Sequence, residues 1–146
     1  MAYITAEARQ ELLDTVAEAT DELGVALAAL GNAYERLDER SADRLEEQLF
    51  RPVQAAYGRA QRAHTEFAAR YGLPGATFES ALGGRPSTGA RDFVELAAAA
   101  LERAEDILVE LQDSISPVEV GDPELRGELA DVRGILAELS GRRNGS

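Results

Sequence analysis

The residue in this sequence best suited to acid–base chemistry is His64, the single histidine of the chain. Tyr57 precedes it by one heptad and Tyr71 follows it by one heptad, so all three fall on one face of a predicted helix. Such an imidazole is either a core-edge side chain hydrogen-bonded to a tyrosine hydroxyl or a backbone carbonyl, or a pH-sensitive group or general base in a pocket. We favour the structural interpretation over an enzyme, because no acid orients the ring and no nucleophile accompanies it.

Metal chemistry has little support in the spacing of the ligand types. Di-iron helical proteins use Glu-x-x-His pairs, and the residue three before His64 is Gln61. Carboxylates four apart, such as Glu18 and Glu22, lie off the apolar positions and indicate a solvated acidic face. The chain has no cysteine, which excludes thiolate metal sites, disulfides and a cysteine nucleophile. We expect neither a metal nor a cofactor.

A glycine-rich stretch could bind an anion. Residues 83–89 read Gly-Gly-Arg-Pro-Ser-Thr-Gly directly before a predicted helix, and Arg85 and Arg91 could hold a phosphate or carboxylate there. The stretch lacks the lysine and the preceding strand of a Walker A loop, so an ordinary capped linker is the other interpretation. Between residues 51 and 91 there are six arginines and two acids, against nine arginines and 25 acids elsewhere. This asymmetry favours either an anion site or a surface that fits an acidic patch on another copy.

Helical spacing of apolar residues predicts the elements that position these groups. The pattern runs over residues 5–37, 41–71, 88–115 and 123–140. Thr5, Ser41, either Ser87 or Thr88, and Asp122 are the expected N-caps. Pro52 predicts a kink or break near residues 48–52, and Gly72 with Leu73 predicts a Schellman ending.

The predicted fold class is all-α. We expect an antiparallel up-and-down four-helix bundle with a long loop between the second and third helices and a short fourth helix. The rival is an extended hairpin of the first two helices that pairs with a second copy. Residues 1–141 are expected to form one domain and residues 142–146 a disordered tail.

The expected fourth helix, of about 18 residues, is shorter than the others and would leave one end of such a bundle open. An up-and-down path places most of the aromatic side chains at that end; they are Tyr3, Phe67, Tyr71, Phe78 and Phe93. An apolar end of this kind predicts a surface that a partner covers.

Composition limits the partners. A net charge of −12 disfavours nucleic acid, and no stretch is apolar enough for a signal peptide or a membrane span, so we expect a cytoplasmic protein. Arginine without lysine, together with abundant alanine and glycine, is typical of a GC-rich bacterial gene.

Two functions follow as hypotheses. The first is a non-enzymatic interaction protein, a homodimer or an adaptor, that uses the open end and the exposed side of the third helix; Tyr3, Phe78 and Phe93 are its candidate interface residues. The second is a protein that binds a small anionic ligand beneath the 72–89 loop, in a pocket formed by His64, Tyr57, Phe67, Tyr71 and Phe93 with Arg85 or Arg91.

Overall fold

A computed structural model of the chain describes residues 2–78 and 89–144, with side chains for residues 5–78 and 89–141. Every regular element in these ranges is helical, which confirms the predicted all-α class. The elements are α1 (Ala2–Glu35), α2 (Glu39–Leu45), a π-helical turn η1 (Glu46–Phe50), α3 (Arg51–Tyr71), α4 (Ala90–Asp113), α5 (Ser116–Glu119) and α6 (Pro123–Asn144).

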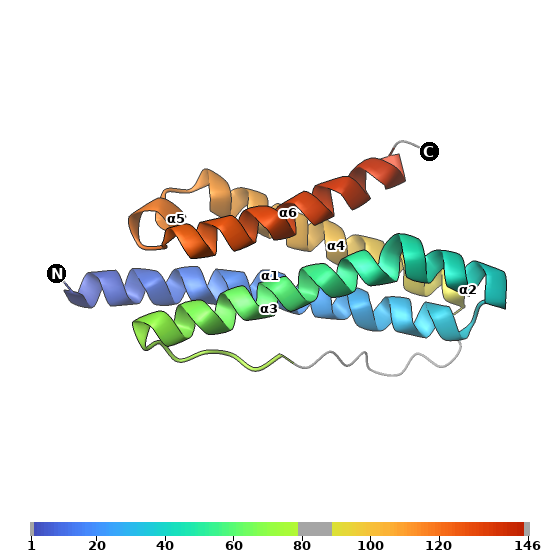
Figure 1. Cartoon of the computed structure of the whole chain (residues 1–146), viewed down its shortest axis with the longest axis horizontal. Coiled ribbons are helices and arrows are strands. Elements are labelled where there is room, and N and C mark those ends of the chain that lie inside the picture. Colours follow the sequence, from blue (N-terminus) through green and yellow to red (C-terminus); the bar gives the residue numbers. More distant parts are fainter. Residues whose placement is uncertain (1, 79–88, 145–146) are drawn as a thin grey trace.

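The helices do not follow the predicted up-and-down path. Figure 1 shows α3 and α4 running in the same direction, both toward the end of the molecule that holds the N-terminus. The start of α4 therefore lies beside the end of α1, where the Arg36 guanidinium lies 4.8 Å from the centre of the Phe93 ring. The chain between α3 and α4 must cross the length of the molecule. Eighteen residues can span up to about 60 Å, whereas α4 is about 36 Å long, so the connection is long enough.

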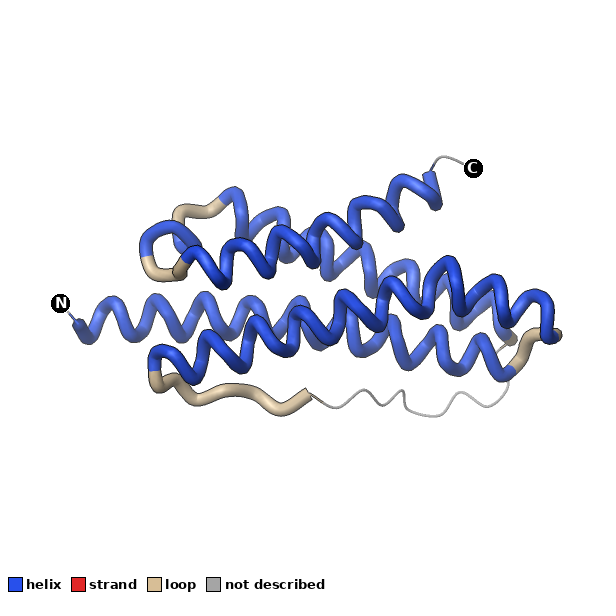
Figure 2. The backbone as a smooth tube through the Cα atoms, in the orientation of Figure 1, coloured by secondary structure: helices blue, strands red, loops and turns tan. Residues whose placement is uncertain are grey.

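Each long helix contacts two neighbours of opposite direction. α1 packs most extensively against α4 and also against α3, while α6 packs against α3 and α4 (Figures 1 and 2). Alanines allow α1 and α4 to approach closely; the fully or nearly fully buried ones are Ala19, Ala26, Ala29 and Ala33 of α1 and Ala97, Ala100 and Ala104 of α4. Leucines, valines and Phe67 fill the rest of a continuous core.

Local sequence signals set several helix ends as predicted. The Asp122 carboxylate accepts a hydrogen bond from the Leu125 amide at 2.8 Å and caps α6. Gly72 is left-handed (φ 63°), and the Leu73 amide donates to the Ala68 carbonyl at 2.8 Å, as in a Schellman ending. Other caps differ from the prediction. Asp38, rather than Ser41, caps α2 by accepting from the Ser41 amide.

Two further helix starts also differ. α1 already begins at Ala2, before Thr5, and Gly89 occupies the N-cap position of α4 without a side-chain cap. Ser87 and Thr88 lie outside the described residues.

Pro52 neither breaks nor sharply ends the second helical segment. The helix continues from Glu39 to Tyr71, and the five-residue π turn η1 directly precedes α3, which has the proline in its first turn. The Arg51 amide donates to the Glu46 carbonyl, five residues back. Widening the helix at this point relieves the crowding that a proline ring causes against the carbonyl four residues earlier.

The predicted open end is wrong, because Asp122 at the start of α6 is bonded to Arg70 and Tyr71 at the end of α3, the end that was expected to lack cover. α6 also has 22 residues rather than about 18, because Gly141 does not end it. Residues 142–144, predicted as part of a disordered tail, belong to this helix. The aromatic rings also do not gather at one end, since Phe67 is fully buried near the N-terminal end and Phe93 is buried at the other.

Candidate functional site

His64 lies in the interior, with 1% of its surface exposed. Its position on α3 faces α1, and residues 73–78 cover it after the chain leaves α3. The Ala76 amide donates to His64 Nε2 at 3.3 Å, and the Phe78 ring meets the imidazole edge-on at 4.8 Å. A Cβ at Gly75 would come 3.2 Å from His64 Cε1, so the segment lies tightly against the ring.

The hydrogen bonding of His64 defines its tautomer. Nε2 accepts a hydrogen bond from the Ala76 amide, so the neutral ring carries its own hydrogen on Nδ1. Nδ1 is buried and has no hydrogen-bond partner among the described residues. Burial lowers the pKa of His64, while the carboxylates of Asp14 and Asp21 on α1 act through space in the opposite direction. The imidazole is therefore held neutral.

The structure does not assemble the predicted ligand pocket. Phe93 lies near Arg36 rather than near His64, and Arg91 is exposed and pairs with Glu95 at 3.4 Å. Tyr57 is partly buried against the core. Arg85 and the side chain of Tyr3 lie outside the described residues. Phe67 and Tyr71 of the predicted set contact each other, with ring centres 4.8 Å apart, and the Phe78 ring lies 4.8 Å from that of His64.

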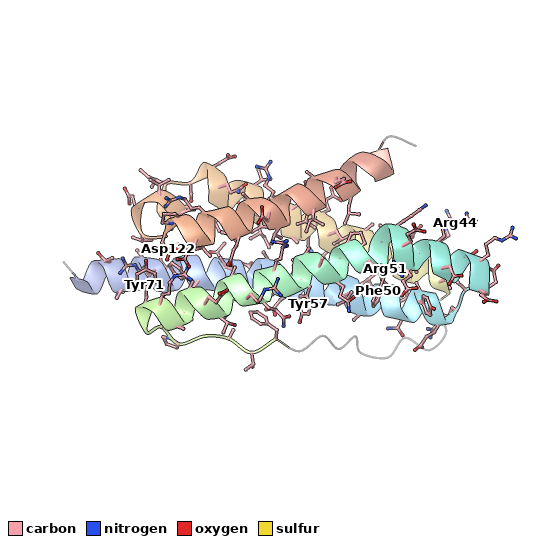
Figure 3. All side chains as sticks on the ribbon, in the orientation of Figure 1. Arg44, Phe50, Arg51, Tyr57, Tyr71 and Asp122 are labelled. Carbon is pink, nitrogen blue, oxygen red and sulfur yellow. The ribbon has the colours of Figure 1, made fainter. Side chains whose placement is uncertain are left out.

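Tyr71 belongs to a cluster that ties α3 to the start of α6 (Figure 3). Its hydroxyl donates to the Asp122 carboxylate at 3.0 Å, and Arg70 donates to both oxygens of the same carboxylate at 2.8 and 2.9 Å. The Arg9 guanidinium stacks 4.1 Å from the centre of the Tyr71 ring while its Nε donates to the Val120 carbonyl. These contacts join the end of α3 to α1 and to the start of α6, so we call the cluster of Arg9, Arg70, Tyr71 and Asp122 the clasp.

Electrostatics in the clasp favours the charged carboxylate. Burial alone would raise the pKa of Asp122, but hydrogen bonds from Arg70, the Leu125 amide and Tyr71 together lower it. The same hydrogen bond to Asp122 raises the pKa of Tyr71, and burial adds to this. Sequence reasoning identified Asp122 as a cap but not its pairing with Arg70, because the pattern within one helix says nothing about what a later helix brings to its surface.

A shallow groove runs between α1 and α4 on the exposed side of α4. Two adjoining depressions of about 490 and 360 Å³ share Glu18 and Ile107. Five carboxylates line them, from Glu18, Asp21, Glu22, Asp106 and Glu110. Ile107 and Leu111 supply apolar surface, and Arg103 is the one cation in the lining, where it pairs with Glu22.

Charge in this groove is incompletely compensated. Burial and the neighbouring Glu22 carboxylate raise the pKa of Asp21, although His64 acts in the opposite direction. Beyond Ser114 the groove meets the α4–α5 corner, where Ile115 is 65% and Val118 69% exposed. Ile115 was predicted to be an inward residue of the third helix, but α4 ends at Asp113.

The comparisons with known proteins identify no relative. No family model, no curated protein and no solved structure matches this chain. Within the described residues, no three histidine or carboxylate side chains are grouped closely enough to hold a metal ion, and no helix is long and apolar enough to cross a membrane. Functional inference therefore depends on the geometry of the groove and of the His64 site.

Proposed function

We propose that this chain is a non-enzymatic interaction protein that binds a cationic segment of another protein in the groove between α1 and α4. The observation that carries the proposal is the lining of that groove, in which five carboxylates face one arginine above an apolar floor. Such a surface would attract lysines and arginines and bury apolar side chains between them.

The spread of the carboxylates supports an extended occupant. Glu18 and Glu22 lie on one helix, and Asp106 and Glu110 lie on the other, each pair one turn apart. Carboxylates along both walls cannot converge on one metal ion, but they suit a helix or strand with cations on both sides. Ile107 and Leu111 would contact the apolar stripe of such a segment.

The arginines argue for a different protein as the partner rather than a second copy of this chain. Arg59 pairs with Asp131, Arg70 with Asp122 and Glu124, and Arg91 with Glu95. Three of the six arginines in the 51–91 stretch thus meet acids of their own chain, which reduces the positive surface that could face an acidic groove. We further propose that the long helical segments form a four-helix bundle with one crossover connection. Such a scaffold would hold the groove rigid.

A direct binding experiment tests this. The probe is an amphipathic peptide with arginines and lysines flanking a leucine stripe, titrated into the full chain by isothermal calorimetry at low and high salt. We expect binding that weakens tenfold or more between 50 and 500 mM salt, as expected for charge pairing. Binding of the peptide should be lost in the variant Glu18→Gln/Asp21→Asn/Asp106→Asn/Glu110→Gln.

A matched variant separates the groove from net charge. Neutralising four exposed acids elsewhere, Glu39, Asp43, Glu47 and Glu66, changes the net charge equally. The control should retain most of the affinity. Equal losses in both variants, or a peptide that fails to bind at low salt, would refute the proposal. Sedimentation of the free chain at micromolar concentration tests the homodimer hypothesis, and a dimer abolished by the groove variant would replace the cationic partner with a second copy.

A further inference from the structure

After Leu73, which is bonded to the end of α3, residues 74–78 lie against His64. Residues 74–77 are exposed, yet they cover an imidazole that is 1% exposed. The contacts to His64 are the Ala76 amide, the Phe78 ring and the close approach of Gly75. One more contact is a 3.3 Å hydrogen bond from the Gln10 amide to the Pro74 carbonyl.

We propose that residues 74–78 form a strap that neutral His64 holds closed and that protonated His64 releases, while Leu73 stays bonded to the end of α3. In the closed strap, the free electron pair on Nε2 accepts a hydrogen bond from the Ala76 amide. A proton taken from water fills that pair, so two N–H groups then face each other at the site of the former hydrogen bond.

The groups around His64 also stabilise the released state. Asp14 and Asp21 of α1 both act on the imidazole electrostatically, and both side chains are exposed. Once the strap leaves, water reaches the ring and its positive charge faces these two carboxylates. The protonated ring is therefore more stable in the open state than in the closed state. A switch requires such a difference between its two states.

No other charged group in the described structure competes for this role. The strap residues 74–78 contain no ionisable side chain, and the residues one turn away on α3 are Ala60, Gln61, Phe67 and Ala68. On α6, which packs against α3, Glu128 interacts with Glu66, Arg62 and Arg70 instead. The response should therefore follow His64 alone, modulated by Asp14 and Asp21.

Nuclear magnetic resonance can follow both partners, because the chain has one histidine and its resonances are unambiguous. The His64 ring is titrated from pH 8 to pH 4.5 while hydrogen exchange of the Ala76 amide is measured and corrected for its intrinsic pH dependence. We expect His64 to titrate below pH 6.5 and Ala76 to exchange at least tenfold faster below that midpoint than above it. The Leu73 amide, bonded to the Ala68 carbonyl, should keep its protection and serves as an internal control.

Variants separate the switch from general acid destabilisation. His64→Phe should leave Ala76 exchange rapid and without a pH-dependent step. Asp14→Asn/Asp21→Asn should lower the midpoint for both His64 and Ala76. The proposal is overturned if His64 titrates with no change at Ala76, if the two midpoints differ, or if buried amides of α1 and α4 lose protection together with Ala76.

Discussion

Replacing Asp122 by alanine should cost more stability than any other exposed or partly exposed polar substitution in the described structure. Its carboxylate is 14% exposed and serves three purposes at once. It caps α6 by accepting a hydrogen bond from the Leu125 amide. It also accepts two hydrogen bonds from the Arg70 guanidinium and one from the Tyr71 hydroxyl. Removing it therefore loosens α6 and α3 at the same point.

The expected loss of stability is the sum of two contributions, the N-cap of α6 and the ion pair with Arg70. Loss of an N-cap costs about 1 kcal/mol. The Arg70 pair lies between an exposed pair, worth about 0.2–1 kcal/mol, and a buried one, whose breakage costs about 3–5 kcal/mol. With Arg70 27% exposed, we assign it about 1–2 kcal/mol, so Asp122→Ala should cost about 2–3 kcal/mol in total.

Chemical denaturation of the wild type, four single variants and the Arg70→Ala/Asp122→Ala double variant gives the parts separately. Asp122→Asn keeps a capping oxygen but loses the charge, so it should cost about 1 kcal/mol. Arg70→Ala should cost about 1 kcal/mol, and the cycle formed with Asp122→Ala should show a coupling of similar size. Asp131→Ala is the control, because its pair with Arg59 is 63% and 47% exposed and should contribute less than about 0.5 kcal/mol.

Two results would refute this reasoning. If Asp122→Ala costs no more than Asp131→Ala, the clasp contributes nothing to stability. If Asp122→Asn costs as much as Asp122→Ala, the ion pair rather than the cap carries the whole effect. The acid response gives an independent check: the lowered pKa of Asp122 stabilises the fold above pH 3.8, and this is lost as the pH falls through the folded-state pKa. Asp122→Asn should remove that dependence.

Three further predictions concern the core, the glycines and His64. Phe67→Ala removes a fully buried ring and should cost about 3–5 kcal/mol in urea denaturation; a cost below 1 kcal/mol would mean that the site collapses freely. A Cβ at Gly134, inside α6, would meet no atom within 4 Å, so Gly134→Ala should raise stability by about 0.5–1 kcal/mol. A Cβ at Gly121 would lie 2.4 Å from the Pro117 carbonyl oxygen, so Gly121→Ala should lower the melting temperature. The opposite order of the two melting temperatures would contradict the packing at the α5–α6 turn. The fold lowers the pKa of His64, so the contribution of the neutral ring to stability is complete above pH 6.5 and is lost as the pH falls from there through the folded-state pKa. In His64→Phe, the melting temperature should depend less on pH over this interval.

Local features of the fold were predictable because their causes are local. Asp122 before Pro123 can cap only the helix that follows it, and Gly72 before Leu73 ends a helix through its own backbone conformation. Apolar spacing likewise revealed all the long helical segments. The π turn before Pro52 was outside this reasoning, because the sequence shows that the proline disturbs the helix but not which adjustment the neighbours allow.

The path of the chain was not predictable in the same way. An amphipathic helix has the same apolar stripe in either direction, and an 18-residue connection can turn back at once or cross the molecule. The assumption of an immediate return placed Phe93 beside His64, and both the aromatic end and the ligand pocket depended on that placement. The contact between Phe93 and Arg36 shows that the connection crosses.

The crossing connection explains the site that sequence reasoning missed. A chain that turned back after Gly72 would leave His64, two turns before the end of α3, without cover. In the described part of the connection, residues 73–78 instead run back along α3, and the Ala76 amide meets His64 (Figure 2). Burial of the single histidine is thus a consequence of topology. The partners expected for His64 were a tyrosine hydroxyl or a backbone carbonyl, whereas the structure gives it the backbone amide of Ala76, which has no signature in the helix that carries the ring.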